Sequence, residues 1–223
     1  MADDQATRRD VRDTYEEIAD HFSKTREYAW PEVESFVESA GNVDLALDVG
    51  CGNGRHAELL ATGAAEVLAL DASRGLLLES RERLASLGDR VALVQGDAAS
   101  LPLDDDSVGL AVYVATLHHL PRREDRRRSL DELARVLAPD GRALVSAWST
   151  AHDRFDASAD DAVGFDTTID WTRPGDEVVP RFYHIYAPDE FREDVAASGL
   201  ALVDFEISSG NCYAVVRPEG KRP

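Results

Sequence analysis

A run of glycines led by an aspartate is the first part of the sequence whose residue types could do chemistry. It extends from Asp48 to Gly54, with glycine at 50, 52 and 54, and it follows the apolar segment 43–49. Glycines allow positive φ and a close approach of the backbone to a ligand, so the run predicts a ligand-binding turn between a strand and a helix. Arg55 stands where the dinucleotide fingerprint requires glycine, and no Gly-Lys-Ser/Thr ends the run as in a phosphate loop. A tight turn without a ligand is the alternative.

Two more aspartates end the next predicted strands. Asp71 follows the glycine turn by about 20 residues, where an acidic side chain can accept hydrogen bonds from both ribose hydroxyls of a nucleoside. Asp97, within Gln-Gly-Asp-Ala, could accept from an adenine amino group, while Ala98 supplies a backbone amide. For Asp71 the structural alternative is capping of the helix after Ser73, and for Asp97 it is an ordinary turn.

The elements that must position these residues alternate between strands and helices, and this order predicts a parallel, doubly wound α/β sheet with helices on both faces. Residues 149–180 are polar, acidic and aperiodic, so we expect a long loop there. One domain is predicted, with a helical cap at 1–42, a core at 43–148, an insertion at 149–187, and a closing helix and hairpin at 188–217. Predicted helices occupy 5–21, 31–40, 55–62, 73–87, 124–137 and 188–198, and predicted strands occupy 43–49, 66–70, 91–95, 108–115, 142–148, 201–207 and 212–217, with 181–186 extended.

The charge composition of the chain indicates the kind of environment in which the protein works. The net charge is −19, from 43 acidic and 24 basic residues, and Lys24 and Lys221 are the only lysines. This pattern predicts a protein adapted to a salt-loaded cytoplasm, and an ordinary acidic protein is the alternative. Since the Debye length is about 3 Å in molar salt, the charge does not exclude an RNA substrate. We expect no membrane span, no secretory signal, and no disulfide framework or cysteine zinc site from Cys51 and Cys212.

The glycine turn and the two strand-end aspartates together resemble the class I S-adenosylmethionine-dependent methyltransferases, over residues 44–148. The resemblance implies a Rossmann-like, seven-stranded, mostly parallel sheet with an N-terminal helical extension, in which the hairpin 201–217 supplies the reversed strand. It also implies S-adenosyl-L-methionine bound over the carboxyl ends of the first strands. The positions that match this cofactor site are Asp48, Gly50, Gly52, Asn53, Gly54, Asp71, Ala72, Asp97 and Ala98.

Other segments are similar to the tRNA wobble-uridine carboxymethyl methyltransferases, which convert 5-carboxymethyluridine at the anticodon to its methyl ester. They are Tyr15–Arg26 followed by Trp30-Pro31, then Leu117–Leu120, Leu130–Leu137, and Arg181–Tyr186, which is similar to the family's Arg-Tyr-Tyr-His stretch. Two departures stand out. Residues 149–180 align only loosely, and Cys212-Tyr213 occupies the place of the family's aromatic pair.

This second resemblance implies roles for further residues. A carboxylate is ionised at pH 7, so its methylation needs no general base, but the site needs cations to hold it. Arg26 and Arg181 are the candidates, with surface ion pairs as the alternative, and His118 follows the fourth strand, where class I enzymes place residues facing the methyl group. One histidine of the pair should face the substrate, and His118 is favoured. The predicted substrate-binding residues, for which core packing is the alternative, are Tyr15, Trp30, His119, Tyr183 and His184, and no metal ligand is predicted.

Partners and competing functions remain open. In the resembling family a small zinc-binding activator protein pairs with the third strand, which implies an exposed apolar edge at Val91–Val94. The basic cluster Arg122–Arg128 could contact tRNA phosphates or pair with acidic neighbours on its own helix. A small-molecule methyltransferase acting on a quinone or polyketide precursor fits the core equally well. A non-catalytic binding module fits less well, because the turn and both aspartates are intact.

Overall fold

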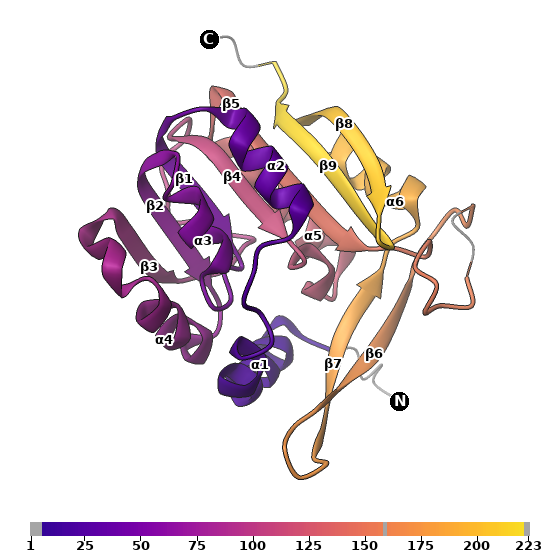
Figure 1. Cartoon of the computed structure of the whole chain (residues 1–223). Coiled ribbons are helices and arrows are strands. Elements are labelled where there is room, and N and C mark those ends of the chain that lie inside the picture. Colours follow the sequence, from indigo (N-terminus) through magenta and orange to yellow (C-terminus); the bar gives the residue numbers. More distant parts are fainter. Residues whose placement is uncertain (1–5, 158–159, 221–223) are drawn as a thin grey trace.

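The computed structural model describes residues 6–157 and 160–220, and a seven-stranded sheet runs through it (Figure 1). The strand order is β3-β2-β1-β4-β5-β9-β8. Neighbouring strands from β3 to β5 are parallel, whereas β9 is antiparallel to both β5 and β8. The predicted doubly wound sheet with its reversed strand is therefore confirmed. The strands are β1 (Val43–Val49), β2 (Ala64–Asp71), β3 (Val91–Gln95), β4 (Val108–Val114), β5 (Leu137–Trp148), β8 (Leu200–Ser208) and β9 (Asn211–Pro218).

Two apolar clusters sandwich the sheet, one on each face. Helices α2, α3 and α4 contribute to one cluster, with Phe36, Leu60 and Leu77 among their buried side chains. Helices α5 and α6 contribute to the other, with Leu133 and Phe191. This layering explains why the central strands read as continuous apolar runs, because both of their faces are covered. The helices are α1 (Arg8–Ser23), α2 (Pro31–Ala40), α3 (Arg55–Leu60), α4 (Arg74–Arg83), α5 (Arg123–Val136) and α6 (Pro188–Ala196).

The chain order of the strands reverses between β1 and β4, which lie side by side at the centre of the sheet. In open α/β sheets this switch point leaves a crevice outside the carboxyl ends of the strands. Helix α1 lies across that end of the sheet in Figure 1. The Glu16 carboxylate fixes it there, accepting hydrogen bonds from the Ser73 hydroxyl and the Gly75 amide at the start of α4, both at 2.8 Å.

Helix boundaries follow the local signals. The predicted first helix began at residue 5, which lies outside the described residues, and α1 starts at Arg8 after an N-terminal capping box made by Thr7 and Asp10. Ser73 caps α4 as predicted, accepting from the Leu76 amide at 3.2 Å. That helix is shorter than predicted, because a 3₁₀ segment at Ala85–Arg90 follows it.

The prediction of one long loop over 149–180 is wrong in its second half. Strand β6 (Phe165–Thr172) pairs with β7 (Val178–Ile185), and this antiparallel hairpin projects away from the main sheet (Figure 1). Its apolar residues pack in a small separate cluster formed by Ile169, Tyr183 and Ile185 against Trp148. The sequence carried the signal, since Phe165, Ile169 and Trp171 all fall on the same alternate positions of 165–172, with aspartate and threonine elsewhere, which is the period of a half-buried strand.

Strand β3 lies at one edge of the sheet, as the predicted docking edge requires. Ala92 is exposed, but Val91, Leu93 and Val94 are only partly exposed, and Val91 and Leu93 pack against the apolar cluster to which α2, α3 and α4 contribute. The large apolar side chains that are well exposed lie elsewhere, among them Leu202, Val203 and Ile207 on the opposite edge strand β8. Among the described residues, no helix combines the length and hydropathy needed to cross a membrane.

Candidate active site

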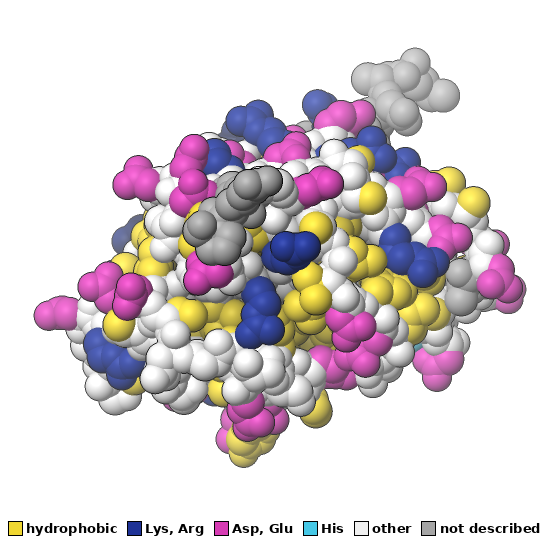
Figure 2. Space-filling view, turned by 90° about the horizontal axis from the view of Figure 1, so that it is seen from above, with side chains coloured by type: hydrophobic (Ala, Val, Ile, Leu, Met, Phe, Trp, Pro, Cys, Tyr) yellow, Lys and Arg dark blue, Asp and Glu magenta, His cyan; other side chains and the backbone are white. Residues whose placement is uncertain are grey.

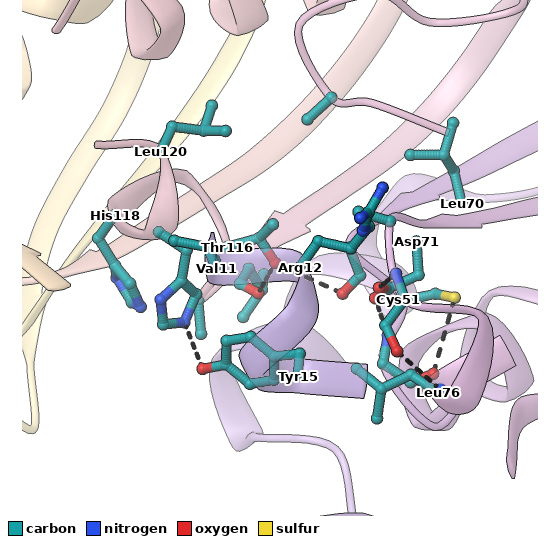
Figure 3. Close-up of a pocket in the computed structure, with 18 of the residues that line it drawn as sticks. Val11, Arg12, Tyr15, Cys51, Leu70, Asp71, Leu76, Thr116, His118 and Leu120 are labelled. Atoms are coloured by element: carbon teal, nitrogen blue, oxygen red, sulfur yellow. Dashed lines mark hydrogen bonds between the residues drawn. The ribbon is translucent and has the colours of Figure 1, made fainter. Parts of the chain in front are cut away.

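A cavity of about 540 Å³ lies at the carboxyl ends of the central strands, with helix α1 on one side of it. Figure 3 shows Asp71 and Cys51 at one end and Tyr15 and His118 at the other. We name the two ends by the residues that form them. The strand-end half comprises Gly50, Gly52, Asp71 and Asp97, and the arginine half comprises Arg26, Arg181, His118 and His119.

The structure brings most of the sequence-predicted site residues to this one cavity. Asp48, Gly54 and His184 are not among the described residues that line it. The predicted residues that do line it are Gly50, Gly52, Asn53, Asp71, Ala72, Asp97 and Ala98, together with Tyr15, Arg26, Trp30, His118, His119, Arg181 and Tyr183.

The glycine turn has the backbone that its sequence predicts. Gly50, Gly52 and Gly54 have φ of 72°, 55° and 82°, in the left-handed region that favours glycine. A Cβ atom at Gly50 would lie 2.3 Å from the Thr116 side chain, and one at Gly54 would lie 2.8 Å from Leu84. A Cβ atom at Gly52 would meet no atom within 4 Å, so this position opens into the cavity. Gly50 and Gly54 therefore serve packing, and Gly52 leaves space for a ligand.

Asp71 ends β2 with both carboxylate oxygens held by the backbone. One oxygen accepts from the Gly52 amide at 2.9 Å, and the other accepts from the Ser73 amide at 2.8 Å. Burial raises the pKa of Asp71 to about 6, and the hydrogen bonds from these backbone amides oppose the rise. The result is a fixed carboxylate with acceptor capacity left over at the cavity wall.

Asp48 lies behind the cavity wall, inside β1. Its side chain is buried, and neither of its carboxylate oxygens has a hydrogen-bond partner among the described residues. Burial raises its pKa to about 7, and the nearby Asp71 carboxylate adds to the rise. The sequence grouped Asp48 with the cofactor-binding residues, but the structure does not bring it to the cavity surface.

Asp97 faces helix α1 across the end of β3. One of its carboxylate oxygens accepts from the Ala99 amide at 2.9 Å, and the other forms an ion pair with Arg8. Arg8 also lies 3.5 Å from Asp125 at the start of α5. The carboxylate predicted to meet an adenine amino group is thus shared with an arginine of α1, which ties this helix to the strand-end half.

The arginine half contains two cations without a carboxylate partner among the described residues. Arg181 is buried, its Nε atom has no hydrogen-bond partner, and its guanidinium lies 4.9 Å from the Trp171 ring centroid and 5.2 Å from that of Tyr183. The Arg26 guanidinium lies over Phe22 at 4.8 Å, and among the described residues its hydrogen bonds go to the two oxygens of Thr25. Burial lowers the pKa of Arg26, and the nearby Arg181 lowers it further.

The two histidines of the Leu117–Leu120 segment are both neutral, because burial lowers the pKa of His118 well below its usual range and that of His119 to about 3. Their hydrogen bonds fix the tautomers. Nδ1 of His118 accepts from the Trp148 amide at 3.0 Å, so its proton is on Nε2. Nδ1 of His119 donates to the Phe182 carbonyl at 2.9 Å, and its Nε2 accepts from the Tyr15 hydroxyl at 2.8 Å. A dashed line at the Tyr15 hydroxyl in Figure 3 marks this last bond.

His184 belongs to a buried network behind the cavity and not to its wall. Its Nδ1 lies 2.7 Å from Asp166 of β6, and its Nε2 lies 3.1 Å from Glu190 of α6. Glu190 also accepts from the Gly164 amide at 2.7 Å. The alternative role of a structural histidine describes this position better than substrate contact, because both ring nitrogens are engaged: Nδ1 bonds across the hairpin to β6, and Nε2 joins the hairpin to α6.

The sequence motifs did not indicate several residues that the structure brings to the cavity or next to it. Arg8, Val11 and Arg12 line it from α1, one helical turn and more before the segment that the family resemblance covered. Trp171 supports both Arg26 and Arg181 from β6, where the sequence predicted a loop. The alternation in β6 was the signal that could have identified Trp171 as an inward-facing residue.

Comparison with known proteins begins with the sequence family described as "Methyltransferase domain", which matches residues 47–145. A protein of Encephalitozoon cuniculi named "Putative methyltransferase" is 31% identical over 205 residues, covering 91% of this chain and 92% of its own length. The tRNA (carboxymethyluridine(34)-5-O)-methyltransferase of Arabidopsis thaliana is 34% identical over 143 residues, which is 64% of this chain. The chain matches only 33% of that relative's length.

Solved structures share the whole fold at low sequence identity. The CcbJ methyltransferase from Streptomyces caelestis has a TM-score of 0.74 at 19% identity and covers 94% of this chain and 98% of its own. A methyltransferase in complex with the Haloferax volcanii Trm112 methyltransferase activator has a TM-score of 0.70 at 17% identity, covering 96% and 99%. The 1,6-didemethyltoxoflavin-N1-methyltransferase of Burkholderia thailandensis, solved with bound S-adenosylhomocysteine, has a TM-score of 0.69 at 19% identity, covering 94% and 87%.

Proposed function

This chain belongs to the class I S-adenosylmethionine-dependent methyltransferases, and we propose that it forms the methyl ester of 5-carboxymethyluridine at the wobble position of tRNA. The use of S-adenosyl-L-methionine as methyl donor follows from the family match and the relatives. The proposed tRNA substrate rests on the arginine half of the cavity and on the similarity to the carboxymethyluridine methyltransferases.

The residues of the strand-end half fit the cofactor. Asp71 presents a carboxylate that two backbone amides already orient, which suits acceptance from ribose hydroxyls. Gly52 leaves open space where any side chain would intrude. When bound, the cofactor supplies an electrophilic methyl group. The chain's own part is to orient the acceptor and to keep water away from it.

The observation that carries the proposal is the pair Arg26 and Arg181. The chain has 43 acidic residues, yet neither of these arginines forms an ion pair with a described carboxylate. Two guanidinium groups held over aromatic rings at the wall of a cavity form a site for an anion, and the planar fork of arginine matches a carboxylate. The anion that completes this site is, in our proposal, the substrate's carboxymethyl group.

The neutral histidines are consistent with such an acceptor. A carboxylate is already ionised at pH 7, so the residues facing it need not remove a proton. His118 offers an Nε2–H donor, and His119 is committed to Tyr15 and the Phe182 carbonyl. The aromatic rings of Trp148 and Tyr183, whose centroids lie 5.2 Å apart at the cavity wall, could stack on a nucleobase.

The test uses labelled cofactor with carboxymethyl-bearing tRNA and with the same tRNA lacking the modification. We expect label only in the carboxymethyl-bearing tRNA, and we expect mild alkali to release it, because a methyl ester hydrolyses where an N-methyl or C-methyl group does not. Label that resists alkali, or equal label in both tRNAs, would contradict the proposed acceptor. The assay should be run with and without an activator protein.

We further propose that a small zinc-binding activator protein pairs with the exposed edge of β3. The support is the position of β3 at the end of the sheet and the putative methyltransferase of the same fold that was solved in complex with the Haloferax volcanii Trm112 activator. Ala92 is exposed on this strand, whereas Leu93 packs against the core. Co-expression with such an activator should increase the soluble yield, and Ala92→Glu should abolish the increase while leaving the isolated chain folded.

A second candidate is a methyltransferase that acts on a small molecule. The specific observation in its favour is the size of the cavity and its apolar lining, which includes Phe22 and Trp30. The Burkholderia thailandensis enzyme of this fold was solved with a small substrate. This candidate predicts activity in a cell extract that survives treatment with RNase, whereas the tRNA proposal predicts its loss.

We also propose that the protein works in the salt-loaded cytoplasm that its composition predicts. Acidic side chains form several separate patches on the face in Figure 2, and at low salt they repel one another. Screening in molar salt removes that repulsion. The melting temperature should rise by about 10 °C or more between 0.1 and 3 M KCl, and a flat profile would favour an ordinary acidic protein.

A further inference from the structure

The segment between α1 and α2, residues 24–30, carries Arg26 but has no regular secondary structure. Two turn hydrogen bonds, from the amides of Thr25 and Arg26 to the carbonyls of the last two residues of α1, account for part of its path. The three consecutive carbonyls of residues 26–28 accept from side chains of the cofactor-binding core. The position of Arg26 therefore depends on groups outside its own segment.

Asn53 provides the central contact. Its side-chain nitrogen donates to the Arg26 carbonyl at 2.8 Å and to the Ser23 carbonyl at 3.2 Å, which uses both amide hydrogens. The assignment of nitrogen and oxygen in this amide is fixed by chemistry, because both partners are carbonyls and can only accept. Asn53 is 7% exposed, and it lies between Gly52 and Gly54, which both have left-handed φ.

Two arginines of the core reinforce the same linker. Arg83 donates to the carbonyls of Arg26 and Glu27, at 3.3 and 2.6 Å, while its Nε pairs with Glu58. Arg55 donates to the Tyr28 carbonyl at 3.1 Å. Asn53 differs from both because it belongs to the turn that borders the cofactor space, so it connects that turn directly to the linker.

We propose that Asn53 is a positioning residue for Arg26, holding the arginine that binds the substrate's carboxylate at a fixed place relative to the glycine turn. This inference rests on the proposed function in one respect, that Arg26 contacts the substrate's anion. The resemblance to other methyltransferases implied a direct cofactor contact for Asn53. The structure instead commits both of its amide hydrogens to the backbone of the substrate side.

The chemical consequence concerns alignment. Methyl transfer requires the acceptor oxygen to lie in line with the methyl group, and a misplacement of about 1 Å can cost about 100-fold in rate. The Arg26 guanidinium has no ion pair with a described carboxylate, so its backbone and the aromatic rings beneath it determine where it lies. Loss of the Asn53 contacts should therefore lower the rate without weakening cofactor binding.

The test compares Asn53→Ala, which removes the donors, with Asn53→Asp, which keeps the shape but places oxygens against two carbonyls. We expect kcat/KM for carboxymethyl-bearing tRNA to fall about 10- to 100-fold in both variants. We expect the affinity for S-adenosylhomocysteine to change less than about threefold. A cofactor affinity that falls about as much as turnover would overturn the proposal and make Asn53 a cofactor ligand.

A double-mutant cycle separates positioning from general damage to the fold. If Asn53 acts through Arg26, then Asn53→Ala should have less than a twofold further effect in the Arg26→Ala background. Losses that multiply independently would overturn the proposal. The matched control is Asn211→Ala, because Asn211 is also 7% exposed and also donates its side-chain amide to a backbone carbonyl, that of Ser209 at 3.1 Å. It lies at the β8–β9 turn, and its kcat/KM should stay within twofold.

Amide hydrogen exchange gives a readout that needs no tRNA. The amides of residues 25 and 26 should exchange at least about tenfold faster in Asn53→Ala than in the unaltered protein, and at the same rate in Asn211→Ala. Unchanged exchange in Asn53→Ala would overturn the positioning role. If the unaltered enzyme failed to label carboxymethyl-bearing tRNA, the proposed function would fail, and the exchange comparison would still decide whether Asn53 fixes the linker.

Discussion

The strand-end half of the cavity is formed by consecutive strand ends, whereas the arginine half is assembled from segments far apart in the chain. In the first, backbone amides orient Asp71, and glycines make room for a ligand. In the second, side chains orient one another: Tyr15 of α1 meets His119 after β4, and Arg181 of β7 lies over Trp171 of β6. The charges differ too, acidic in the first half and basic in the second.

This difference separates two tasks. A turn fixed by backbone hydrogen bonds and glycine conformations tolerates few substitutions but serves any acceptor, and it suits a cofactor. Side chains carried by α1 and by the β6–β7 hairpin can change without disturbing the sheet, and they suit the choice of substrate. Variants in the strand-end half should therefore alter cofactor affinity, and variants in the arginine half should alter turnover.

The largest effect is expected for Gly52→Val. Its side chain would enter open space at the cavity wall, and its φ of 55° is strained for a branched residue. Titration calorimetry should show at least about a 100-fold loss of affinity for S-adenosylhomocysteine, equivalent to about 2.7 kcal/mol or more.

Gly41→Val is the matched control for that loss. Gly41 also has a left-handed φ, 73°, and a Cβ atom there would likewise meet no atom within 4 Å. It follows α2 and is not among the described residues that line the cavity. The control should lose about 1–2 kcal/mol of stability from backbone strain but keep its cofactor affinity. Equal losses of cofactor affinity in both variants would mean that strain, and not the cavity, decides the result.

Arg181→Ala should have the next largest effect, on turnover. Hydrogen bonds to charged groups contribute about 1.5–3 kcal/mol, so kcat/KM should fall about 10- to 150-fold while cofactor affinity changes less than twofold. Arg192→Ala removes another arginine that lies over an aromatic ring, Phe205 at 5.0 Å, but pairs with Asp189 on the surface. It should leave turnover within twofold. A large loss of cofactor affinity in Arg181→Ala would place Arg181 beside the adenosyl group. Cofactor binding would then not be confined to the strand-end half.

The sequence was sufficient for the strand-end half because its signals are local. Strands β1 and β3 and helix α2 have the predicted bounds, since apolar runs, Pro31 and the glycine turn each determine structure within a few residues. The spacing from the turn to Asp71 translates directly into neighbouring strand ends in a parallel sheet. Asn53 was the exception, because its partners lie at the end of α1 and in a linker that no local pattern describes.

The arginine half could not be derived in the same way. No periodicity indicates that Tyr15 and His119 form a hydrogen bond, or that His184 is engaged between two carboxylates while Tyr183 lines the cavity. Those contacts depend on how α1 and the β6–β7 hairpin pack on the sheet. Resemblance to a family pointed to the right segments, but it could not separate the residues that face the cavity from those that hold the segments in place.

Asp71→Asn should weaken the cofactor about tenfold, because it removes a charged acceptor but keeps the shape. The pKa of Asp71 is raised to about 6, and only the ionised form accepts from two ribose hydroxyls. Cofactor affinity should therefore improve as pH rises from 5 to 7, and the variant should lack this dependence.

The free energy of unfolding should depend on the ionisation of Asp71 in the opposite direction. A raised carboxyl pKa stabilises the fold below about pH 4, and this contribution is lost as pH rises through 6, so the variant should gain relative stability at pH 8.

The smallest effect is expected where a different mechanism would predict a large one, at His118. Burial lowers the pKa of both histidines of the arginine half, so both are neutral at pH 7, and the Trp148 amide occupies Nδ1 of His118, which leaves Nε2–H as the donor of this cavity-lining residue. Removal of a general base typically costs 100- to 10,000-fold, whereas loss of one neutral donor costs about 0.5–1.5 kcal/mol, or roughly 2- to 12-fold. We expect the 2- to 12-fold loss for His118→Gln, together with a kcat that is flat between pH 6.5 and 8.5 for the unaltered enzyme.

A rate that rises with pH near 7, or a loss above 100-fold, would mean that the acceptor must be deprotonated. The arginine half would then act on a neutral nucleophile, and the charge contrast between the two halves would no longer indicate a carboxylate.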